Sequence, residues 1–355
     1  MPLPAGLSPS ARQLAEAVRD RPDLPERLAR MALAFRQLHQ GEDARRLARW
    51  ARDRAPWDAR VRLLTDWVDR REVPLWHFRL THDAERNEVY AEALRRAVRP
   101  GMTVFEIGTG TGLLAMLAVQ AGADHVYTCE RQPELAATAR EIVARNGMAG
   151  RITVFAQPAH EVALPGRADL FVAEIVDNQL LGEHVLALAR LARRRFLVPG
   201  APMLPGVVST WGSLATRGSE PGFRAGSPRG LDLSPLDRFA PSVVCTGPGG
   251  GGAELLSEPV ELLSFDLSAD AEPPSRRLDL EVVSGGVAEG VIRWIRLDFG
   301  EGLALENRPP QRSLSWFPCL HLFREPLRVE PGDVVPLEVS QDGERIFLGL
   351  ASGGR

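Results

Sequence analysis

The stretch TVFEIGTGTGLLAMLAVQAGADHVYTCE, residues 103–130, decides the fold. It opens with a short apolar run, Thr103–Ile107, of the kind that forms a buried strand. Three glycines at alternate positions follow, and then an apolar helical pattern covers Leu113–Val119. A second strand pattern, His125–Cys129, leads directly to Glu130. This order of strand, glycine turn, helix, strand and acid predicts half of a doubly wound α/β sheet, with its ligand site at the carboxyl ends of the strands.

The spacing of the glycines indicates which ligand the turn accepts. A dinucleotide fingerprint has glycine at its first, third and sixth positions, but the sixth position here is Leu113. The turn suits a ligand that places no phosphates there, such as S-adenosylmethionine (SAM). We expect the methionine part of SAM to lie against Gly108 and Gly110, where no Cβ blocks its approach. Glu130 would then accept hydrogen bonds from both ribose hydroxyls. The alternative is an α/β core with a tight glycine turn and a surface glutamate.

Two glutamates follow a later strand pattern. The run Asp169–Ala173 ends at Glu174, and Glu183 comes nine positions further on, after a mostly apolar loop. Beside a methyl donor, two carboxylates can hold a guanidinium by forked, charge-assisted hydrogen bonds. With this spacing the chain resembles the protein arginine methyltransferase family, whose members carry a "double-E" loop.

The resemblance extends over about residues 73–355. Upstream, His77, Asp83, Arg86 and Tyr90 match the helices that precede the SAM-binding domain in the family. The resemblance implies that Arg86 binds the carboxylate of the methionine moiety and that His77 belongs to the cofactor site.

Further matches lie downstream. The loop after the strand pattern Ile152–Phe155 contains His160, which takes the position of an adenine contact in the family or is an exposed loop histidine. Residues 195–200 resemble the strand that leads into the family's β-barrel. Residues 217–241 correspond to its dimerisation arm, and Gly230–Ser234 resembles part of that arm.

The chain departs from the family pattern in two places. Leu80 stands where the family usually has methionine, and Ser315 stands where a Thr-His-Trp loop has its histidine, although Trp316 is present. In the family that histidine pairs with an aspartate at the position of Asp83. We expect Asp83 to lack this partner, so that another group serves or the proton is lost to water. His321 is either such a group or a packed histidine of an apolar strand.

These observations assign two sets of site residues and no metal site. The catalytic set is Glu174, Glu183, Asp83 and Trp316, and the cofactor-binding set is His77, Arg86, Gly108, Gly110, Glu130 and His160.

Composition excludes several other classes. The chain has 355 residues, 44% apolar and 25% charged, as is usual for a soluble globular protein. Its net charge of −3 argues against a nucleic-acid binder. It shows no apolar run of membrane-spanning length and no signal-peptide pattern. The scattered cysteines, Cys129, Cys245 and Cys319, predict neither a disulfide framework nor a metal site, and we expect a reducing cytoplasm.

The sequence predicts three parts. Residues 1–72 form a helical module, which is either a generic extension or a unit like one tetratricopeptide repeat, from the spacing of Phe35, Ala44, Ala48, Ala51 and Pro56. Residues 73–200 form a Rossmann-like SAM-binding domain. Residues 201–355 contain short β-patterns between turns, which predict a mainly-β barrel or sandwich that receives the acceptor.

We therefore expect a SAM-dependent N-methyltransferase that acts on the guanidino nitrogen of arginine in a protein or peptide. It would form a homodimer through the arm, with neither nucleic acid nor membrane as a partner. One alternative acceptor is free L-arginine or another small guanidine or amine. Another alternative is an idle scaffold that binds partners through its helical module, against which the intact motifs argue.

Overall fold

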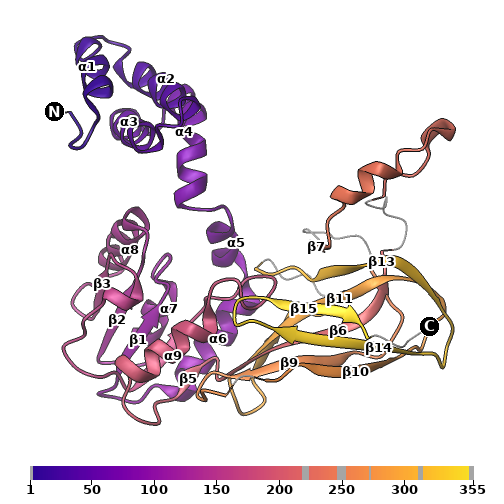
Figure 1. Cartoon of the computed structure of the whole chain (residues 1–355). Helices are drawn as coiled ribbons and strands as arrows, with labels where there is room; N and C mark the ends of the chain where they lie inside the picture. Colours follow the sequence, from indigo (N-terminus) through magenta and orange to yellow (C-terminus); the bar gives the residue numbers. More distant parts are fainter. Residues whose placement is uncertain (1–2, 218–223, 246–252, 272, 311–314, 352–355) are drawn as a thin grey trace. The chain divides into compact units, whose positions relative to one another are not determined.

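The strands of the central stretch, β1 (Thr103–Ile107) and β2 (His125–Cys129), begin and end where the sequence predicts (Figure 1). The computed structural model describes residues 3–217, 224–245, 253–271, 273–310 and 315–351. The chain divides into two units, Met1–His77 and Phe78–Arg355. Each unit is described by itself below.

The first unit is helical. Ser8 accepts a hydrogen bond from the Ala11 amide, and Pro9 occupies the first turn of the first helix, as the sequence predicts. Small and apolar side chains such as Leu28, Phe35 and Leu47 form its core. Its likeness to a tetratricopeptide repeat stays a prediction. The helices are α1 (Pro9–Ala17), α2 (Leu24–Gln37), α3 (Gly41–Arg54) and α4 (Ala59–Glu72), and α5 (Trp76–His82) crosses the unit boundary.

The second unit begins with a parallel sheet of order β3-β2-β1-β4-β5. The chain leaves β1 in one direction for β2 and β3 and then returns to β1's other side, so a switch point lies between β1 and β4, where ligands bind in such sheets. Helices α6, α7 and α8 pack on one face, and α9 packs on the other. The further elements are α6 (Ala84–Ala97), α7 (Leu113–Gln120), α8 (Pro133–Arg145), β3 (Ile152–Phe155), the 3-10 helix η1 (Ala159–Glu161), β4 (Leu170–Ala173), α9 (Val185–Arg195) and β5 (Met203–Leu204).

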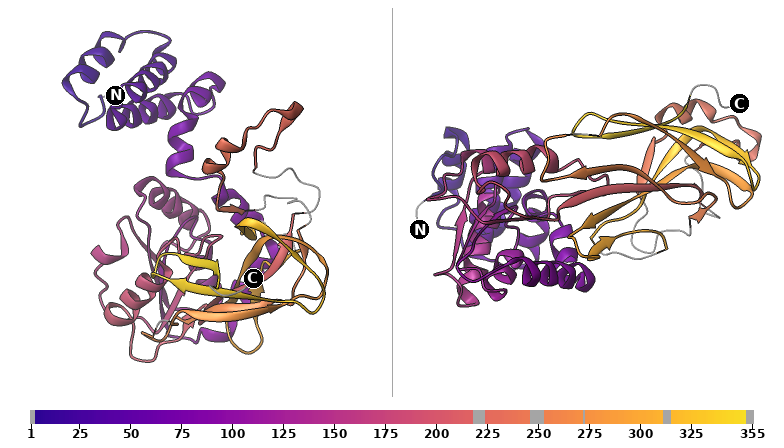
Figure 2. Two further views of the ribbon diagram at one scale, coloured as in Figure 1. Left: turned by 45° about the vertical axis from the view of Figure 1, so that its right-hand side comes forward. Right: turned by 90° about the horizontal axis from the view of Figure 1, so that it is seen from below.

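Antiparallel strands form the rest of this unit. One sheet has seven strands. Five of them are neighbours in the order β7-β13-β11-β6-β8, while β9 also pairs with β6 and β12 also pairs with β11. The strands β10, β14 and β15 form a second sheet in that order. Figure 2 shows these orange and yellow strands running beside one another. The strands are β6 (Val207–Thr216), β7 (Val243–Cys245), β8 (Glu254–Leu255), β9 (Val260–Asp266), β10 (Arg276–Glu281), β11 (Gly286–Asp298), β12 (Ala304–Glu306), β13 (Cys319–Val329), β14 (Val334–Gln341) and β15 (Ile346–Leu350), with η2 (Pro228–Gly230) and η3 (Ser234–Phe239) in the arm.

One apolar core joins the parallel sheet to the β part. Phe105 of β1 and Phe196 after α9 belong to the same buried cluster as Leu262 of β9 and Ile295 of β11. The strand predicted over residues 195–200 is wrong, because α9 continues to Arg195 and Leu197 forms only an isolated bridge with Ala168. The parallel sheet and the β part therefore share this core, and each also has a smaller apolar cluster of its own.

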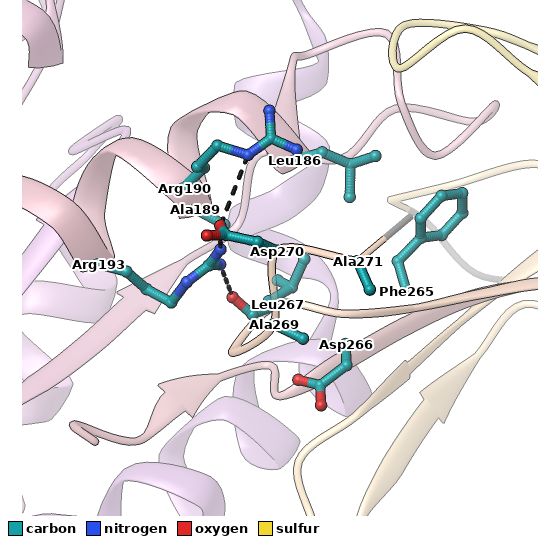
Figure 3. Close-up of a pocket in the computed structure, with 10 residues that line it drawn as sticks. All are labelled: Leu186, Ala189, Arg190, Arg193, Phe265, Asp266, Leu267, Ala269, Asp270 and Ala271. Carbon is teal, nitrogen blue, oxygen red and sulfur yellow. Dashed lines mark hydrogen bonds and ion pairs between the residues drawn. The ribbon is translucent and has the colours of Figure 1, made fainter. Parts of the chain in front are cut away.

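An ion-pair cluster ties α9 to the loop after β9 (Figure 3). Arg190, Arg193 and Arg194 all approach the Asp270 carboxylate, and Arg193 also donates to the Leu267 carbonyl. A shallow cavity lies beside this cluster. Since all three guanidinium groups already form ion pairs with the Asp270 carboxylate, we interpret the cluster as a structural contact and not as a ligand site.

The structure corrects the prediction about cysteines. Cys245 of β7 and Cys319 of β13 lie opposite each other and form a disulfide, whereas Cys129 is a buried free thiol. The pairing joins residues 74 positions apart, and strand neighbours at that separation are not visible in the sequence. The disulfide removes the cysteine argument for a reducing compartment. No helix in the described part of the chain could span a membrane, and the cytoplasmic location stays a prediction.

Candidate active site

The glycine turn after β1 adopts a backbone that glycine tolerates well. Gly108 and Gly110 have φ angles of +87° and +53°. The Gly110 amide donates to Glu130 Oε2 at 3.1 Å, and the Gln132 amide donates to Glu130 Oε1 at 3.0 Å. A carboxylate has about four acceptor positions, so Glu130, which is buried, keeps about half of its capacity for a ligand.

The double-E loop packs directly against this turn. A Cβ on Gly108 would lie 3.0 Å from Ile175 Cγ2, which is tighter than ordinary contact. The residue before Ile175 is Glu174, at the carboxyl end of β4. The structure therefore brings the predicted cofactor turn and the predicted acceptor loop together at the switch point of the sheet.

A buried ion pair connects the two halves of the site. Arg86 Nη2 donates to Glu174 Oε2 at 2.6 Å, and both side chains are almost completely buried. Arg86 lies in the first turn of α6, where Asp83 caps the helix by accepting from the Arg86 amide at 3.1 Å. Burial raises the pKa of Glu174, and the positive charge of Arg86 opposes this rise. One oxygen of Glu174 is thus already bound.

Glu183 is held quite differently. Its side chain lies at the surface end of the loop and makes no hydrogen bond or ion pair within the described ranges. Surrounding protein atoms and the nearby charges of Glu174 and Asp177 raise the pKa of Glu183 to about 7. Because the residue is exposed, water screens part of this effect. The charge of Glu174 is thus close enough to the Glu183 carboxyl to affect its protonation.

The loop between the glutamates is held by its own residues. Asp177 Oδ1 accepts from the amides of Gln179 and Gly182, each at 3.1 Å. A Cβ at Gly182 would lie 2.3 Å from Asp177 Oδ2, so only glycine fits there without a shift. Leu180 is fully buried with φ of +76°, a strained value for leucine. These features give the loop one defined course.

The segment that contains Trp316 supports the loop from the β part. Trp316 Nε1 donates to the Val176 carbonyl at 2.9 Å, and the Phe317 amide donates to Asn178 Oδ1 at 2.8 Å. Trp316 is buried. Its contacts therefore orient the double-E loop. Leu314, the neighbour of Ser315 in this motif, lies outside the described residues.

Asp83 lacks the family histidine, as expected, and another group takes its place as hydrogen-bond partner. The Ser315 hydroxyl donates to Asp83 Oδ2 at 2.5 Å, and the Ser315 amide donates to the same oxygen at 3.0 Å. The residue in place of the family histidine thus reaches the same aspartate. Its short hydroxyl and its backbone amide together replace the longer side chain.

The three candidate histidines differ in their surroundings. His77 is buried against the Trp76 ring, and burial lowers the pKa of His77 to about 4. His160 lies in η1 with an exposed ring, and its carbonyl accepts from Arg195. His321 lies in β13, where burial lowers its pKa to about 3. His321 is thus neutral at pH 7 and does not replace the family histidine beside Asp83, where Ser315 is bound.

Sequence reasoning missed Glu106. It is the fourth residue of β1, is 1% exposed, and both of its carboxylate oxygens are buried without a hydrogen-bond partner among the described residues. Burial raises the pKa of Glu106 to about 8. Its signal in the sequence was an acid inside an otherwise apolar strand, two positions before Gly108.

Comparison with known proteins first defines the class. Residues 86–204 match the family model of the ribosomal protein L11 methyltransferase (PrmA). The fold is similar to that of PRMT1 in the Trypanosoma brucei enzyme-prozyme heterotetrameric complex with AdoHcy, with a TM-score of 0.69, 22% identity and coverage of 78% of this chain and 93% of that chain. It is also similar to Arabidopsis thaliana protein arginine methyltransferase 10, with a TM-score of 0.64, 20% identity and coverage of 80% and 96%. The solved structures confirm the predicted fold class, and the family model that matches the parallel-sheet part is that of a methyltransferase.

Sequence relatives define the family. The chain is 35% identical to the arginine N(omega)-methyltransferase of Streptomyces achromogenes subsp. streptozoticus over 283 residues, which is 77% of each chain. It is 28% identical to protein arginine N-methyltransferase 9 of Xenopus laevis over 76% of this chain and 38% of the relative. It is 30% identical to protein arginine N-methyltransferase 7 of Drosophila erecta over 65% and 37%. The chain spans well under half of these two longer relatives. It belongs to the arginine N-methyltransferase family, as predicted.

Proposed function

We propose that SAM binds at the glycine turn after β1. The support for this proposal comes from side chains that keep hydrogen-bonding positions free for a ligand. Glu130 retains acceptor positions for the ribose hydroxyls, and Arg86 has a buried Nε without a partner near the place expected for the methionine carboxylate. Gly108 and Gly110 leave room for the ligand, and His77 and His160 remain predicted contacts.

Glu174 and Glu183 form the proposed acceptor clamp. The observation that carries the proposal is that two carboxylates stand at the ends of one loop that packs against the glycine turn, and that the charge of Glu174 helps to raise the pKa of Glu183. A guanidinium can donate forked hydrogen bonds to both of them. Since Arg86 occupies Oε2 of Glu174, the acceptor uses the remaining capacity of this carboxylate.

The residues of the chain act mainly by positioning and electrostatics. When bound, SAM supplies an electrophilic sulfonium methyl group. Glu174 and Glu183 orient one terminal nitrogen of the acceptor and hold the positive charge away from it. Because the pKa of a guanidinium is above ~12, the clamp polarises the group and does not deprotonate it beforehand. Asp83 Oδ2 already accepts two hydrogen bonds from Ser315, so the released proton passes to water. Asp83 and Trp316 act by holding the loop.

We favour arginine in a protein or peptide as the acceptor. Two of the relatives bear the name protein arginine N-methyltransferase. A second candidate is free L-arginine, because the name of the Streptomyces relative specifies arginine and not protein. The names of these relatives support each possibility, and a direct assay separates them.

The assay incubates the enzyme with methyl-labelled SAM and either free L-arginine or a pool of arginine-containing peptides. Mass spectrometry identifies the methylated product. All 43 basic residues of the chain are arginine, so the enzyme must be separated from the acceptor before measurement. Methylated peptides with unmodified free arginine would support the first candidate, and the reverse would support the second. Transfer to neither, by protein that binds SAM, would contradict the proposal.

We also propose that the chain forms a homodimer through its arm. Leu231, Leu233, Leu236 and Phe239 are large apolar side chains of the arm that lie exposed in the single chain. Figure 1 shows this segment standing out from the strands. An exposed group of apolar side chains is typical of an interface. Residues 218–223 of the predicted arm lie outside the described residues.

A further inference from the structure

One arginine lies inside the β part, directly beneath the double-E loop. The side chains of β11 that face the main core are Val291, Arg293, Ile295 and Leu297. The three apolar members share this core with Ile175 and Leu180 of the loop. Arg293 interrupts the apolar series and is 0% exposed.

The guanidinium of Arg293 reaches the middle of the loop. Its Nη1 donates to the Gln179 carbonyl at 3.2 Å, and its Nη2 lies 3.5 Å from Gln179 Oε1. In the part of the chain that the structure describes, no carboxylate lies within ion-pair distance of Arg293, and its Nε has no partner. The charged and titratable groups that face it are Asp177 of the loop and His321 of β13.

This placement is unfavourable for stability by itself. A buried guanidinium without a paired carboxylate loses hydration that two hydrogen bonds to an amide residue only partly replace. Burial lowers the pKa of Arg293 to about 10, so it remains a cation at neutral pH. An apolar side chain of similar length would fill the same space without this cost. An apolar side chain, however, could not donate hydrogen bonds to Gln179 as Arg293 does.

The two glutamates depend on the loop to different degrees. Glu174 is fixed at the end of β4 and by its ion pair with Arg86. The Glu183 side chain has no such partner among the described residues. Its position follows from the course of the loop alone, and Gln179 lies between the two glutamates.

We propose that Arg293 is a positioning residue for the acceptor: by holding Gln179, it places Glu183 opposite Glu174. This inference rests on the proposed function of the two glutamates as a clamp. It adds a residue of the β part, more than a hundred positions further along the chain, to the determinants of acceptor binding.

The test compares Arg293→Met and Arg293→Lys with Arg296→Met in the full chain. Arg296 lies on the same strand but pairs with Glu306 at 3.3 Å and is partly exposed, so it is a matched control. We expect Arg293→Met to lower kcat/KM for the acceptor substrate at least tenfold, mainly by raising KM. SAM affinity should stay within threefold of the wild type. Arg293→Lys should recover part of the loss, because it restores one donor. Arg296→Met should stay within twofold of the wild type.

A second readout does not require turnover. Hydrogen exchange of a peptide that covers residues 174–184 should be at least tenfold faster in Arg293→Met than in the wild type, while its Tm is unchanged or higher. A low Tm with lost SAM binding in Arg293→Met would overturn the inference, since the residue would then be structural. Unchanged loop exchange and kcat/KM would also overturn it. If Glu183→Gln is inactive and Arg293→Met is fully active, only this inference fails; if both are fully active, the clamp itself is wrong.

Discussion

At the scale of single residues, the two glutamates of the proposed clamp are not equivalent. Glu174 is buried and bound to Arg86, which is itself a predicted cofactor ligand. Glu183 is exposed and has no partner in the described ranges. A change at Glu174 therefore alters the cofactor side of the site as well, whereas a change at Glu183 tests the acceptor side alone.

We expect Glu183→Gln to lower turnover at least about 100-fold, the scale of losing one preorganised electrostatic group. The amide keeps the shape of the side chain but removes the charge that holds the guanidinium. SAM affinity should stay within threefold, a change below about 1 kcal/mol. Glu174→Gln should lose turnover and also change SAM affinity, because it leaves Arg86 without its carboxylate. Single-turnover kinetics and calorimetry measure both effects, and near-normal turnover of Glu183→Gln would refute the clamp.

Glu106 makes the stability of the SAM-free protein depend on pH. Its pKa is about 8 in the folded protein against an ordinary 4.5. Between these values the folded state binds a proton that the unfolded state has lost, so the free energy of unfolding falls as pH rises from about 4.5 to about 8. Glu106→Gln should remove this contribution, which is at most about 5 kcal/mol.

Urea unfolding of both proteins at pH 5 and pH 8 without SAM provides the measurement. The difference in free energy between the variant and the wild type should grow in favour of the variant as pH rises. Equal differences at the two pH values would show that Glu106 ionises normally in the folded protein. The comparison cancels the contribution of Glu183, whose pKa is also raised.

At the scale of elements, the sequence predicts what is local. The parallel strands are apolar on both faces, so Thr103–Ile107, His125–Cys129 and Ile152–Phe155 are found with the bounds that the pattern indicates. The strand expected over residues 195–200 failed because basic residues before Phe196 extend the helix, and apolar residues after it fill a core without pairing.

Local sequence patterns do not predict contacts between elements that are distant in the chain. The bond of Ser315 to Asp83 spans 232 positions, that of Arg293 to Gln179 spans 114, and the disulfide spans 74. Each depends on strand register and on which face of a strand a side chain occupies. The residues of the site were therefore predictable where motifs are contiguous, and the residues that support the site were not.

Asp83 links two elements, and its removal should cost more than the removal of its partner. Its carboxylate caps α6 and also accepts two hydrogen bonds from Ser315. We expect Asp83→Ala to lower the free energy of unfolding by about 2–4 kcal/mol, from the lost cap and two unsatisfied donors. Ser315→Ala keeps the amide contact and should cost about 1 kcal/mol. Denaturant unfolding measures both values, and a larger loss for Ser315→Ala would contradict this view of the contact.

At the scale of the whole molecule, the site is built from sequence-distant parts of one unit. The predicted cofactor turn belongs to the parallel sheet, and the segments that hold the predicted acceptor loop belong to the β part. A shared apolar core and the ion pairs of α9 with Asp270 fix these parts against each other. The arm does not share in that core: its large apolar side chains are exposed. Within the single chain, the parts around the predicted site bury their apolar side chains, whereas the arm does not.

The exposed arm predicts a second copy as its partner. Leu236 and Phe239 of η3 are 60% and 72% exposed, and burying both in an interface would contribute about 3–5 kcal/mol. We expect the wild type to have twice the 38.9 kDa mass of one chain in light scattering at micromolar concentration. The variant Leu236→Asp/Phe239→Asp should be a monomer, because two charges cannot be buried there without partners.

Phe347→Asp provides the control, since Phe347 of β15 is also exposed but lies outside the arm. This variant should remain a dimer, which separates a specific interface from a general loss of surface hydrophobicity. A wild-type monomer with full activity would refute the dimer. A dimer that persists in the Leu236→Asp/Phe239→Asp variant would instead place the interface elsewhere, and the unit Met1–His77 would be the next part to test.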